Sequence, residues 1–536
     1  MLRISQIKLA LDEPLDALRA RVAKKLRVTP ATFTEFRIYK ESIDARKPHE
    51  IWFSYTIDVT LEAAIEQKIL SKKPKNVAVT PDLSYHFPTA GKKPLTKRPV
   101  VIGFGPAGMF AALLLAQMGY KPLVLERGEA VDARVASIER FWADGKLNPA
   151  SNVQFGEGGA GTFSDGKLTT RVRDLRSRKV IEEFVAAGAP EDILYKAHPH
   201  VGTDLLRGIV KNIRQKIIQL GGSVSFEHQV TDFETTNGKL SALTMADGTR
   251  LLTDAAILAI GHSARDTFEA LYKRKIAMQA KPFAVGVRIE HPQTVIDRAQ
   301  YKEFAGHARL GAAEYRLTYK AKNGRGVYTF CMCPGGLVVP SSSEPNRLVT
   351  NGMSEHARDA QNANSGLLVQ IFPEDFPDNS PLAGVAFQRE LEEKAFKMGG
   401  GGYKAPAQLV GDFLANRAST EIRTVTPSYA LGVTPTNLAE LFPDWATEDL
   451  RAAIRDFDNK LHGFAMPDAV MTGVESRSSS PIRINRDDET LESLSTAGLY
   501  PAGEGAGFAG GIVSAAIDGL KVAEKLIETY ASLSEY

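Results

Sequence analysis

Cysteine is nearly absent from this chain of 536 residues, which holds only Cys331 and Cys333. Two thiols cannot build a disulfide framework, and they exclude a zinc site made mainly of thiolates. No apolar run reaches the roughly 18 to 20 residues that cross a bilayer, the longest candidate being residues 109–118. The amino terminus soon meets Asp12 and Glu13, which is not the pattern of a signal peptide. We therefore expect a cytoplasmic protein that does not engage a membrane.

Charge of one sign is not in large excess either, because the chain has 66 Lys and Arg and 63 Asp and Glu, for a formal net charge of +3. The basic cluster Lys92, Lys93, Lys97 and Arg98 lies in a stretch with several prolines and is typical of a solvated linker. We do not expect a nucleic-acid partner. An apolar fraction of 43% indicates a folded protein, and the length predicts two or three domains.

The first 83 residues predict a small α+β module. Alternating and helically spaced apolar residues indicate strands over 3–9, 33–40, 51–59 and 76–79 and helices over 14–26 and 61–70. The order βαββαβ predicts a ferredoxin-like sheet with both helices on one face. Because the module has no evident catalytic cluster, we interpret it as an accessory domain with a potential protein partner.

A dinucleotide-binding pattern follows. Residues 100–102 are a β-branched run typical of a buried parallel strand, and the helix is predicted over 109–118. The glycines between them permit a tight turn, close approach of a pyrophosphate and close packing of helix on strand. A structural glycine turn is the alternative. The residues of this turn predicted to bind the cofactor are Gly103, Gly105, Pro106, Ala107 and Gly108.

The second strand of this unit, over 121–125, ends at Glu126. A carboxylate at that point can accept hydrogen bonds from both hydroxyls of an adenosine ribose. It also disfavours a 2′-phosphate by charge repulsion, although the neighbouring Arg127 complicates that preference. Both residues are predicted to lie at the adenosine end of the cofactor.

A second strand–glycine loop–helix unit closes the chain. It runs from Tyr500 through Gly503 and Glu504 to Gly510, Gly511 and Ile512, and the helix is predicted over 513–527. A plain NAD domain does not need such an element. FAD is longer, and a second helix amino terminus can meet its ribityl chain and the N1–O2 edge of the ring, where the helix dipole favours negative charge. The pair of units therefore predicts FAD.

A third glycine-rich segment covers residues 154–168, with five glycines in fifteen residues. Such a segment cannot pack through side chains, so its backbone is expected to approach something closely, for which a flat flavin ring is suited. A mobile surface loop is the alternative. Gly159, Ser164 and Lys167 are the candidate flavin contacts.

These motifs carry a resemblance. The strand–Gly103-x-Gly105-x-x-Gly108–helix–Glu126 unit, Ala502-Gly503-Glu504 and the turn at Gly261 together resemble the glutathione-reductase-like FAD superfamily. The strings over 155–167, 330–336 and 351–354 are similar to a bacterial family of FAD-dependent dehydrogenases, over nearly the whole chain. The resemblance implies bound FAD, a redox role, contact of Gly261 with the FAD and Val230 near the adenine, but no substrate. Where the superfamily commonly has Gly-Asp, this chain has Gly503-Glu504.

The predicted fold class is α/β: a two-dinucleotide-binding-type FAD domain with a parallel sheet, helices and a β-meander, an inserted α+β domain and the ferredoxin-like module. The predicted boundaries are 1–83 for the module, 84–98 for a linker, 99–270 and 485–536 for the two parts of the FAD domain, and 271–484 for the inserted substrate domain.

The chemistry leaves several alternatives open. Cys331 and Cys333 could form a redox pair, or be two small residues that face one side of a strand because their spacing is two. His262 could be an acid or base or a strand-end cap, and Arg477 could hold a substrate carboxylate or pair with Glu475 or solvent. His291 is expected to be structural. We assign no catalytic residue and no metal.

The favoured function is an FAD-dependent oxidoreductase, a dehydrogenase or reductase, acting on a small molecule through flavin N5. NAD(P)H stays open as a transient reductant, although we do not expect a dedicated NAD(P)H domain. The alternatives are a flavin monooxygenase, a flavoprotein that modifies tRNA, and a sensor or electron-transfer partner without turnover.

Overall fold

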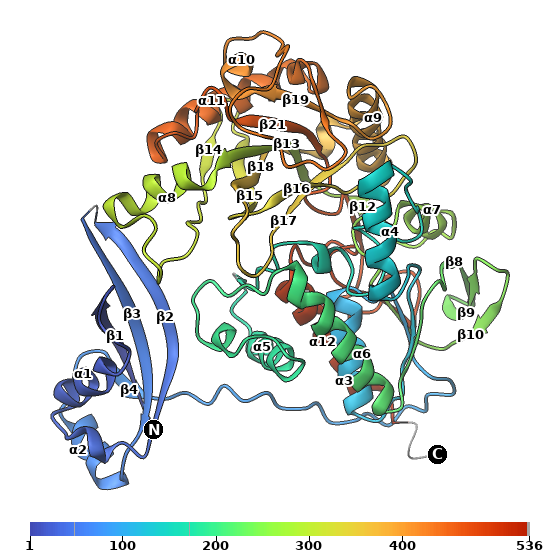
Figure 1. The fold of residues 1–536 in the computed structure, drawn as a ribbon. Helices are drawn as coiled ribbons and strands as arrows, with labels where there is room; N and C mark the ends of the chain where they lie inside the picture. The colour runs from blue at the N-terminus through green and yellow to red at the C-terminus, as the bar shows by residue number, and fades with distance from the viewer. Residues whose placement is uncertain (48, 171, 533–536) are drawn as a thin grey trace.

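The computed structural model describes residues 1–47, 49–170 and 172–532. Figure 1 shows the amino-terminal module on one side, a parallel-sheet part at the base and a larger mixed sheet above it. The mixed α/β class with a parallel sheet is confirmed. The domain boundaries stay predictions. No helix in the described ranges is both long and apolar enough to cross a membrane.

The amino-terminal module has the predicted element order, and its sheet runs β2-β3-β1-β4 with antiparallel neighbours. Alternate residues of β1 and β3 are buried, which gives the sheet one face for packing. Its elements are β1 (Leu2–Ala10), α1 (Ala17–Leu26), β2 (Glu35–Lys47), β3 (Glu50–Thr60), α2 (Ala63–Ser71) and β4 (Val77–Val79).

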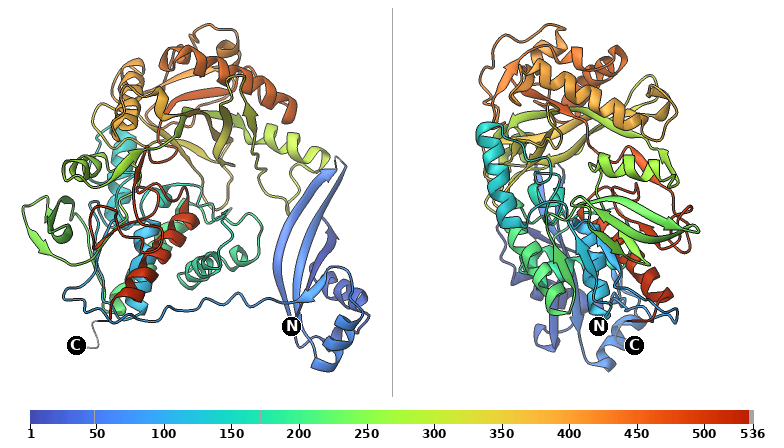
Figure 2. Two further views of the ribbon diagram at one scale, coloured as in Figure 1. Left: turned by 180° about the vertical axis from the view of Figure 1, so that it is seen from behind. Right: turned by 90° about the vertical axis from the view of Figure 1, so that its right-hand side faces the viewer.

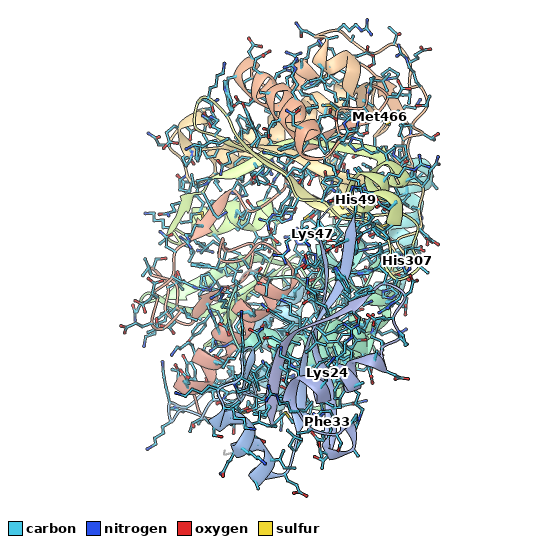
Figure 3. The ribbon with its side chains drawn as sticks, turned by 90° about the vertical axis from the view of Figure 1, so that its left-hand side faces the viewer. Lys24, Phe33, Lys47, His49, His307 and Met466 are labelled. Carbon is cyan, nitrogen blue, oxygen red and sulfur yellow. The ribbon has the colours of Figure 1, made fainter. Side chains whose placement is uncertain are left out.

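The long β2–β3 hairpin of this module reaches the part of the chain that holds the larger mixed sheet, called the upper domain below. His49 Nδ1 lies 2.8 Å from Glu303 Oε1, and His307 Nε2 lies 3.2 Å from Asp12 Oδ1 (Figure 3). At its other side Glu41 exchanges backbone hydrogen bonds with residues 195 and 197, which belong to the parallel-sheet part. The module thus contacts both other parts of the chain.

The parallel-sheet part has a five-stranded sheet in the order β23-β11-β5-β6-β7, in which all neighbours run parallel. Each strand of this sheet has only three residues, and the central ones are completely buried. The meander β8–β10 lies apart as a separate three-stranded sheet. The elements are β5 (Val100–Ile102), α3 (Pro106–Gln117), β6 (Leu123–Leu125), α4 (Val131–Asp144), α5 (Arg176–Ala186), α6 (Thr203–Gln219), β7 (Ser223–Ser225), β8 (Val230–Thr236), β9 (Lys239–Met245), β10 (Arg250–Leu252), β11 (Ala256–Leu258), α7 (Arg265–Lys273), β23 (Leu499–Pro501) and α12 (Ile512–Thr529).

The upper domain is built on a seven-stranded sheet in the order β14-β15-β18-β13-β21-β19-β20, mostly antiparallel. The helices α9, α10 and α11 lie on its outer side, and the hairpin β16–β17 lies between it and the parallel-sheet part (Figures 1 and 2). The elements are β12 (Met278–Ala280), β13 (Phe283–Pro292), α8 (Gln293–Tyr301), β14 (Thr318–Lys320), β15 (Gly326–Cys333), β16 (Leu337–Pro340), β17 (Thr350–Met353), β18 (Asn362–Ile371), α9 (Ala383–Met398), β19 (Ala405–Leu409), α10 (Val410–Leu414), β20 (Val433–Pro435), α11 (Asp444–Lys460), β21 (Val470–Glu475) and β22 (Ile482–Ile484).

Candidate cofactor-binding site

The first glycine turn connects β5 to α3. Gly103 has a φ of +96°, a conformation that L side chains rarely adopt, and a Cβ at Gly108 would lie 1.9 Å from the Gly103 carbonyl oxygen. The helix begins at Pro106 rather than at the expected residue 109, because proline at the first helical position has its φ preset and needs no donor there. The turn has the tight geometry that the glycine spacing predicted.

Glu126 is buried beside this turn and accepts three backbone hydrogen bonds. Phe104 N donates to Oε2 over 2.7 Å, while Gly128 N and Gly156 N donate to Oε1 over 2.9 and 3.0 Å. A carboxylate has about four acceptor positions. One position, on Oε2, is therefore left for a ribose hydroxyl, where the sequence led us to expect two.

Arg134 is a residue of this site that sequence reasoning missed. It lies on α4 with no exposed surface, and its guanidinium donates to the carbonyls of Asn152, Val153, Glu157 and Gly159 over 2.6 to 3.0 Å. A guanidinium has five donors in a fixed plane, so one side chain can hold a loop that lacks side chains of its own. The sequence of α4 gave no signal for these backbone partners.

The loop that Arg134 holds packs directly on the first glycine turn. A Cβ at Gly159 would lie 2.9 Å from Gly105 Cα, and one at Gly161 would lie 3.0 Å from Ile512 Cγ1. The segment is therefore a fixed part of the site. Its glycines are needed because backbone approaches backbone from both sides.

Two predicted flavin contacts in this loop have partners within the chain. Ser164 Oγ donates to Gly161 O over 2.7 Å and accepts from Gly166 N over 3.1 Å. Lys167 Nζ donates to the Met332 carbonyl and lies 4.0 Å from Glu314 Oε2, so it ties the loop to β15 of the upper domain. Their contact with a flavin stays a prediction.

The second glycine segment meets the first. A Cβ at Gly503 would lie 2.6 Å from Ala107 Cβ, and one at Gly519 on α12 would lie 2.0 Å from the Ala107 carbonyl oxygen. Figures 1 and 2 show α12 beside α3. Asp518, which sequence reasoning missed, fixes the loop by accepting Gly503 N over 2.7 Å and pairing with Arg486 over 2.7 Å.

The turn at Gly261 belongs to the same place, because a Cβ at Gly505 would lie 2.4 Å from the Gly261 carbonyl oxygen. Arg127 lies at the edge of the site, where it donates to Asp266 and Thr267 over 2.9 Å and covers the Phe155 ring at 4.3 Å. Val230 is buried at the start of β8. Its position near an adenine stays a prediction.

The two cysteines do not face one side of β15, and that expectation was wrong. The pairing of β15 with β18 shifts register between Phe330 and Cys333, which marks a β-bulge, and Cys331 has a φ of +41°. Cys331 is exposed and Cys333 is buried. Desolvation nonetheless raises the pKa of Cys331 to about 12 and that of Cys333 to about 11. Exchange requires a thiolate, so a redox pair gains no support.

Three other candidates also have assigned contacts. Arg477 donates two parallel hydrogen bonds of 2.9 Å to Glu392, and its third nitrogen donates to Ser343 Oγ. The alternative that it pairs with Glu475 or solvent is therefore not what the structure shows. Desolvation, followed by the charges of Arg477 and Arg265, lowers the pKa of His262 to about 3, so this imidazole is neutral at neutral pH. His291 is buried against the Phe464 carbonyl at 2.8 Å, a structural position.

The arrangement fits a long dinucleotide. The amino termini of α3 and α12, both helices of more than two turns, belong to loops that touch one another. Helix amino termini attract phosphate and other electron-rich groups. Beyond them, Gly510 and Gly261 have no neighbour where a Cβ would point, and the Glu504 carboxylate has no donor within the described ranges. These positions suit FAD.

Comparison with known proteins gives a relative in Clostridium beijerinckii, an uncharacterized protein 51% identical over 531 residues, with 99% of each chain covered. The chain belongs to the family of this protein. Residues 282–478 match the family described as "FAD-dependent protein, C-terminal domain-like", and residues 1–60 match a domain of unknown function. The first of these matches supports FAD. The matched descriptions do not mention NAD(P)H.

Solved structures resemble the chain more remotely. A glycine oxidase from Bacillus cereus matches at 10% identity and a TM-score of 0.32, with 82% of this chain and 99% of that chain covered. A halogenase, PltM, in complex with FAD matches at 11% identity and a TM-score of 0.38, with 80% and 69% covered. At these scores we draw no functional argument from either.

Proposed function

We propose that this protein is an FAD-dependent oxidoreductase, a dehydrogenase or reductase of two-dinucleotide-binding type that acts on a small molecule. The observation that carries the proposal is the meeting of three glycine segments, far apart in sequence, at the amino termini of α3 and α12. Close backbone contact at Gly105–Gly159, Ala107–Gly519 and Gly261–Gly505 is expensive to build with side chains present. It is expected where a cofactor must approach the backbone.

Each part of the chain has a role in this proposal. The turn over 103–108 binds the pyrophosphate at the start of α3, and Glu126 accepts a ribose hydroxyl through its remaining position on Oε2. Arg134 holds the loop that covers the turn, and Asp518 holds the loop before α12. When bound, FAD would supply the hydride or electron transfer. The protein's part is to bind and orient the cofactor and to keep water from it.

The upper domain is the proposed place for the substrate, since Lys167 connects the glycine loop to β15. The lowered pKa of His262 makes its imidazole a weak base, and Arg477 is paired within the protein, so neither supports a role in proton transfer. We therefore propose no proton-transfer residue.

The test is reconstitution followed by anaerobic reduction. Purified protein is expected to bind one FAD per chain, and the bound flavin should bleach with a small-molecule reductant from a panel that includes NADH and NADPH. Re-oxidation by a panel of small acceptors would then identify the substrate class. A protein that takes up no FAD contradicts the proposal. A bound flavin that none of the panel reduces would contradict turnover and favour the role of a sensor.

A further inference from the structure

Two charged side chains, Lys281 and Glu504, reach the same region from different parts of the fold. The segment over 480–484 connects them. Lys281 N donates to Pro481 O over 2.8 Å, just before β13 of the upper domain begins. On its other side, Ser480 Oγ donates to Gly505 O over 3.2 Å and Ile484 N to Ala506 O over 3.1 Å. Both residues are therefore positioned by one short piece of backbone.

The Glu504 backbone is fixed at the centre of the candidate site. Its neighbours on both sides are immobilised, Gly503 against Ala107 and Gly505 against the Gly261 backbone. Glu504 O also accepts Gly507 N over 2.9 Å, which closes the turn. The Glu504 backbone thus lies next to both the pyrophosphate turn and the Gly261 turn.

Neither side chain has a charged partner. Within the described ranges no carboxylate lies within 4.0 Å of Lys281 Nζ, whose only hydrogen bond, 3.4 Å long, goes to the Pro282 carbonyl, and no donor reaches the Glu504 carboxylate. Both residues are half-buried. Each interacts electrostatically with the other, but they form no ion pair. Half-buried unpaired charges are costly, so their persistence here needs a reason.

The other charged groups nearby are already engaged. Arg483 lies over the Phe508 ring at 4.6 Å and its charge opposes that of Lys281, while Arg486 is paired with Asp518. Lys281 and Glu504, by contrast, have neither an ion pair nor a ring contact in the described ranges.

We propose that Lys281 and Glu504 together bind a polar stretch of the cofactor, Lys281 donating to one of its acceptor oxygens and Glu504 accepting from one of its hydroxyl or ring N–H groups. Lys281 would then be a cofactor-binding residue contributed by the junction between the two sheets. The inference rests on the proposed function. Desolvation raises the pKa of Glu504 to about 7 and lowers that of Lys281, as expected for groups that await a partner.

The acceptor oxygen can come from two ends of FAD, the pyrophosphate or the carbonyl groups of the flavin ring. Both are oxygen acceptors for an ammonium group, and the structure favours neither. ADP-ribose carries the pyrophosphate and lacks the flavin, so it separates the two sources.

The experiment measures the equilibrium Kd of FAD and of ADP-ribose for wild-type apoprotein, Lys281→Met, Glu504→Gln and the control Lys273→Met. Lys273 is an exposed lysine at the end of α7. Loss of a charge-assisted hydrogen bond predicts that Lys281→Met and Glu504→Gln each raise the FAD Kd roughly tenfold or more, with no change for Lys273→Met. The Tm of each apoprotein is measured in parallel.

The ADP-ribose arm locates the contact. An equal rise in both Kd values for Lys281→Met assigns the pyrophosphate, and a rise for FAD alone assigns the flavin end. An FAD Kd unchanged by Lys281→Met, together with a lower apoprotein Tm, would overturn the inference because Lys281 would then be a structural counter-charge of Glu504. If wild-type protein itself does not bind FAD, the proposed function fails instead.

Discussion

Two glutamates of the site differ in a way that explains how the protein is built. Glu126 is buried and has three backbone donors, while Glu504 lies at the opposite glycine loop and has none in the described part of the chain. In the Glu126 region the protein satisfies its own hydrogen bonds, since the loops are held by Arg134 and by the Glu126 carboxylate. In the Glu504 region the backbone is hydrogen-bonded, but the carboxylate lacks a donor in the described part of the chain. A folded apoprotein is thus expected to be rigid at the adenosine end and to gain most from ligand at the other end.

The largest effect is expected from filling the glycine turn. Gly108→Ala places a Cβ 1.9 Å from the Gly103 carbonyl, so α3 must move away from β5. We expect a loss of stability of more than ~3 kcal/mol and loss of bound FAD, measured by denaturant unfolding and flavin content. The matched control is Gly208→Ala, because Gly208 lies in α6 with no neighbour within 4 Å. Equal stability of the two variants would contradict the turn geometry.

A smaller but still large effect is expected at Arg134. Arg134→Met leaves four buried carbonyl groups without their donor, which should cost about 3–5 kcal/mol and loosen the loop over 152–159. Limited proteolysis and the FAD Kd report on that loop. Arg140→Met, at an exposed position of the same helix, is the control. A variant whose loop stays protease-resistant would show that glycine packing alone holds it.

The difference between these two residues marks what the sequence could predict. The turn over 103–108 was predictable because its requirements are local: strand, glycine spacing and helix follow one another. Arg134 was not, because its partners lie 18 to 25 residues away and are backbone groups of any residue type. The same reason applies to two of the donors of Glu126, Phe104 N and Gly156 N, and to the Gly503 N–H that Asp518 accepts.

Errors in the prediction have local causes. The side-chain alternation expected for Cys331 and Cys333 fails because one bulge changes the register, and bulges leave little trace in sequence. One alternative for Arg477 was pairing with Glu475 or solvent, but Glu392 of α9, distant in sequence, is its partner.

The two glutamates themselves provide the next comparison. Glu126→Gln turns one acceptor atom into a donor that faces a backbone N–H, which should cost the apoprotein about 1–3 kcal/mol. Glu504→Gln removes an unpartnered charge and should not destabilise the apoprotein. Urea unfolding of both apoproteins at pH 8 measures the difference. If Glu504→Gln destabilises the apoprotein more than Glu126→Gln does, the proposed difference between the two glutamates is wrong.

A pH profile sharpens this comparison further. Desolvation raises the pKa of Glu504 from 4.5 to about 7, so between these pH values the unfolded chain releases a proton that the folded apoprotein keeps. The free energy of unfolding contributed by this group therefore falls as pH rises through the window. The difference between wild type and Glu504→Gln should grow from pH 5 to pH 7 in favour of the variant. A difference that does not change with pH would contradict the shift.

The smallest effect is expected at the two cysteines, which belong to neither region. Cys331→Ser should change stability by less than ~1 kcal/mol, because its side chain is exposed. A thiol reagent should modify Cys331 slowly, since its raised pKa leaves little thiolate, and should spare the buried Cys333. Mass spectrometry after alkylation gives both rates. Faster modification of Cys333 would place the bulge elsewhere.

The central claim is that three glycine segments form one binding site for FAD, and titration of wild-type apoprotein with FAD tests it most directly. We predict saturable binding of one FAD per chain. We also predict that ADP-ribose competes with FAD, because it shares the part of the cofactor that the turn over 103–108 binds. An apoprotein that is folded by circular dichroism and still leaves added FAD free in solution would contradict the account.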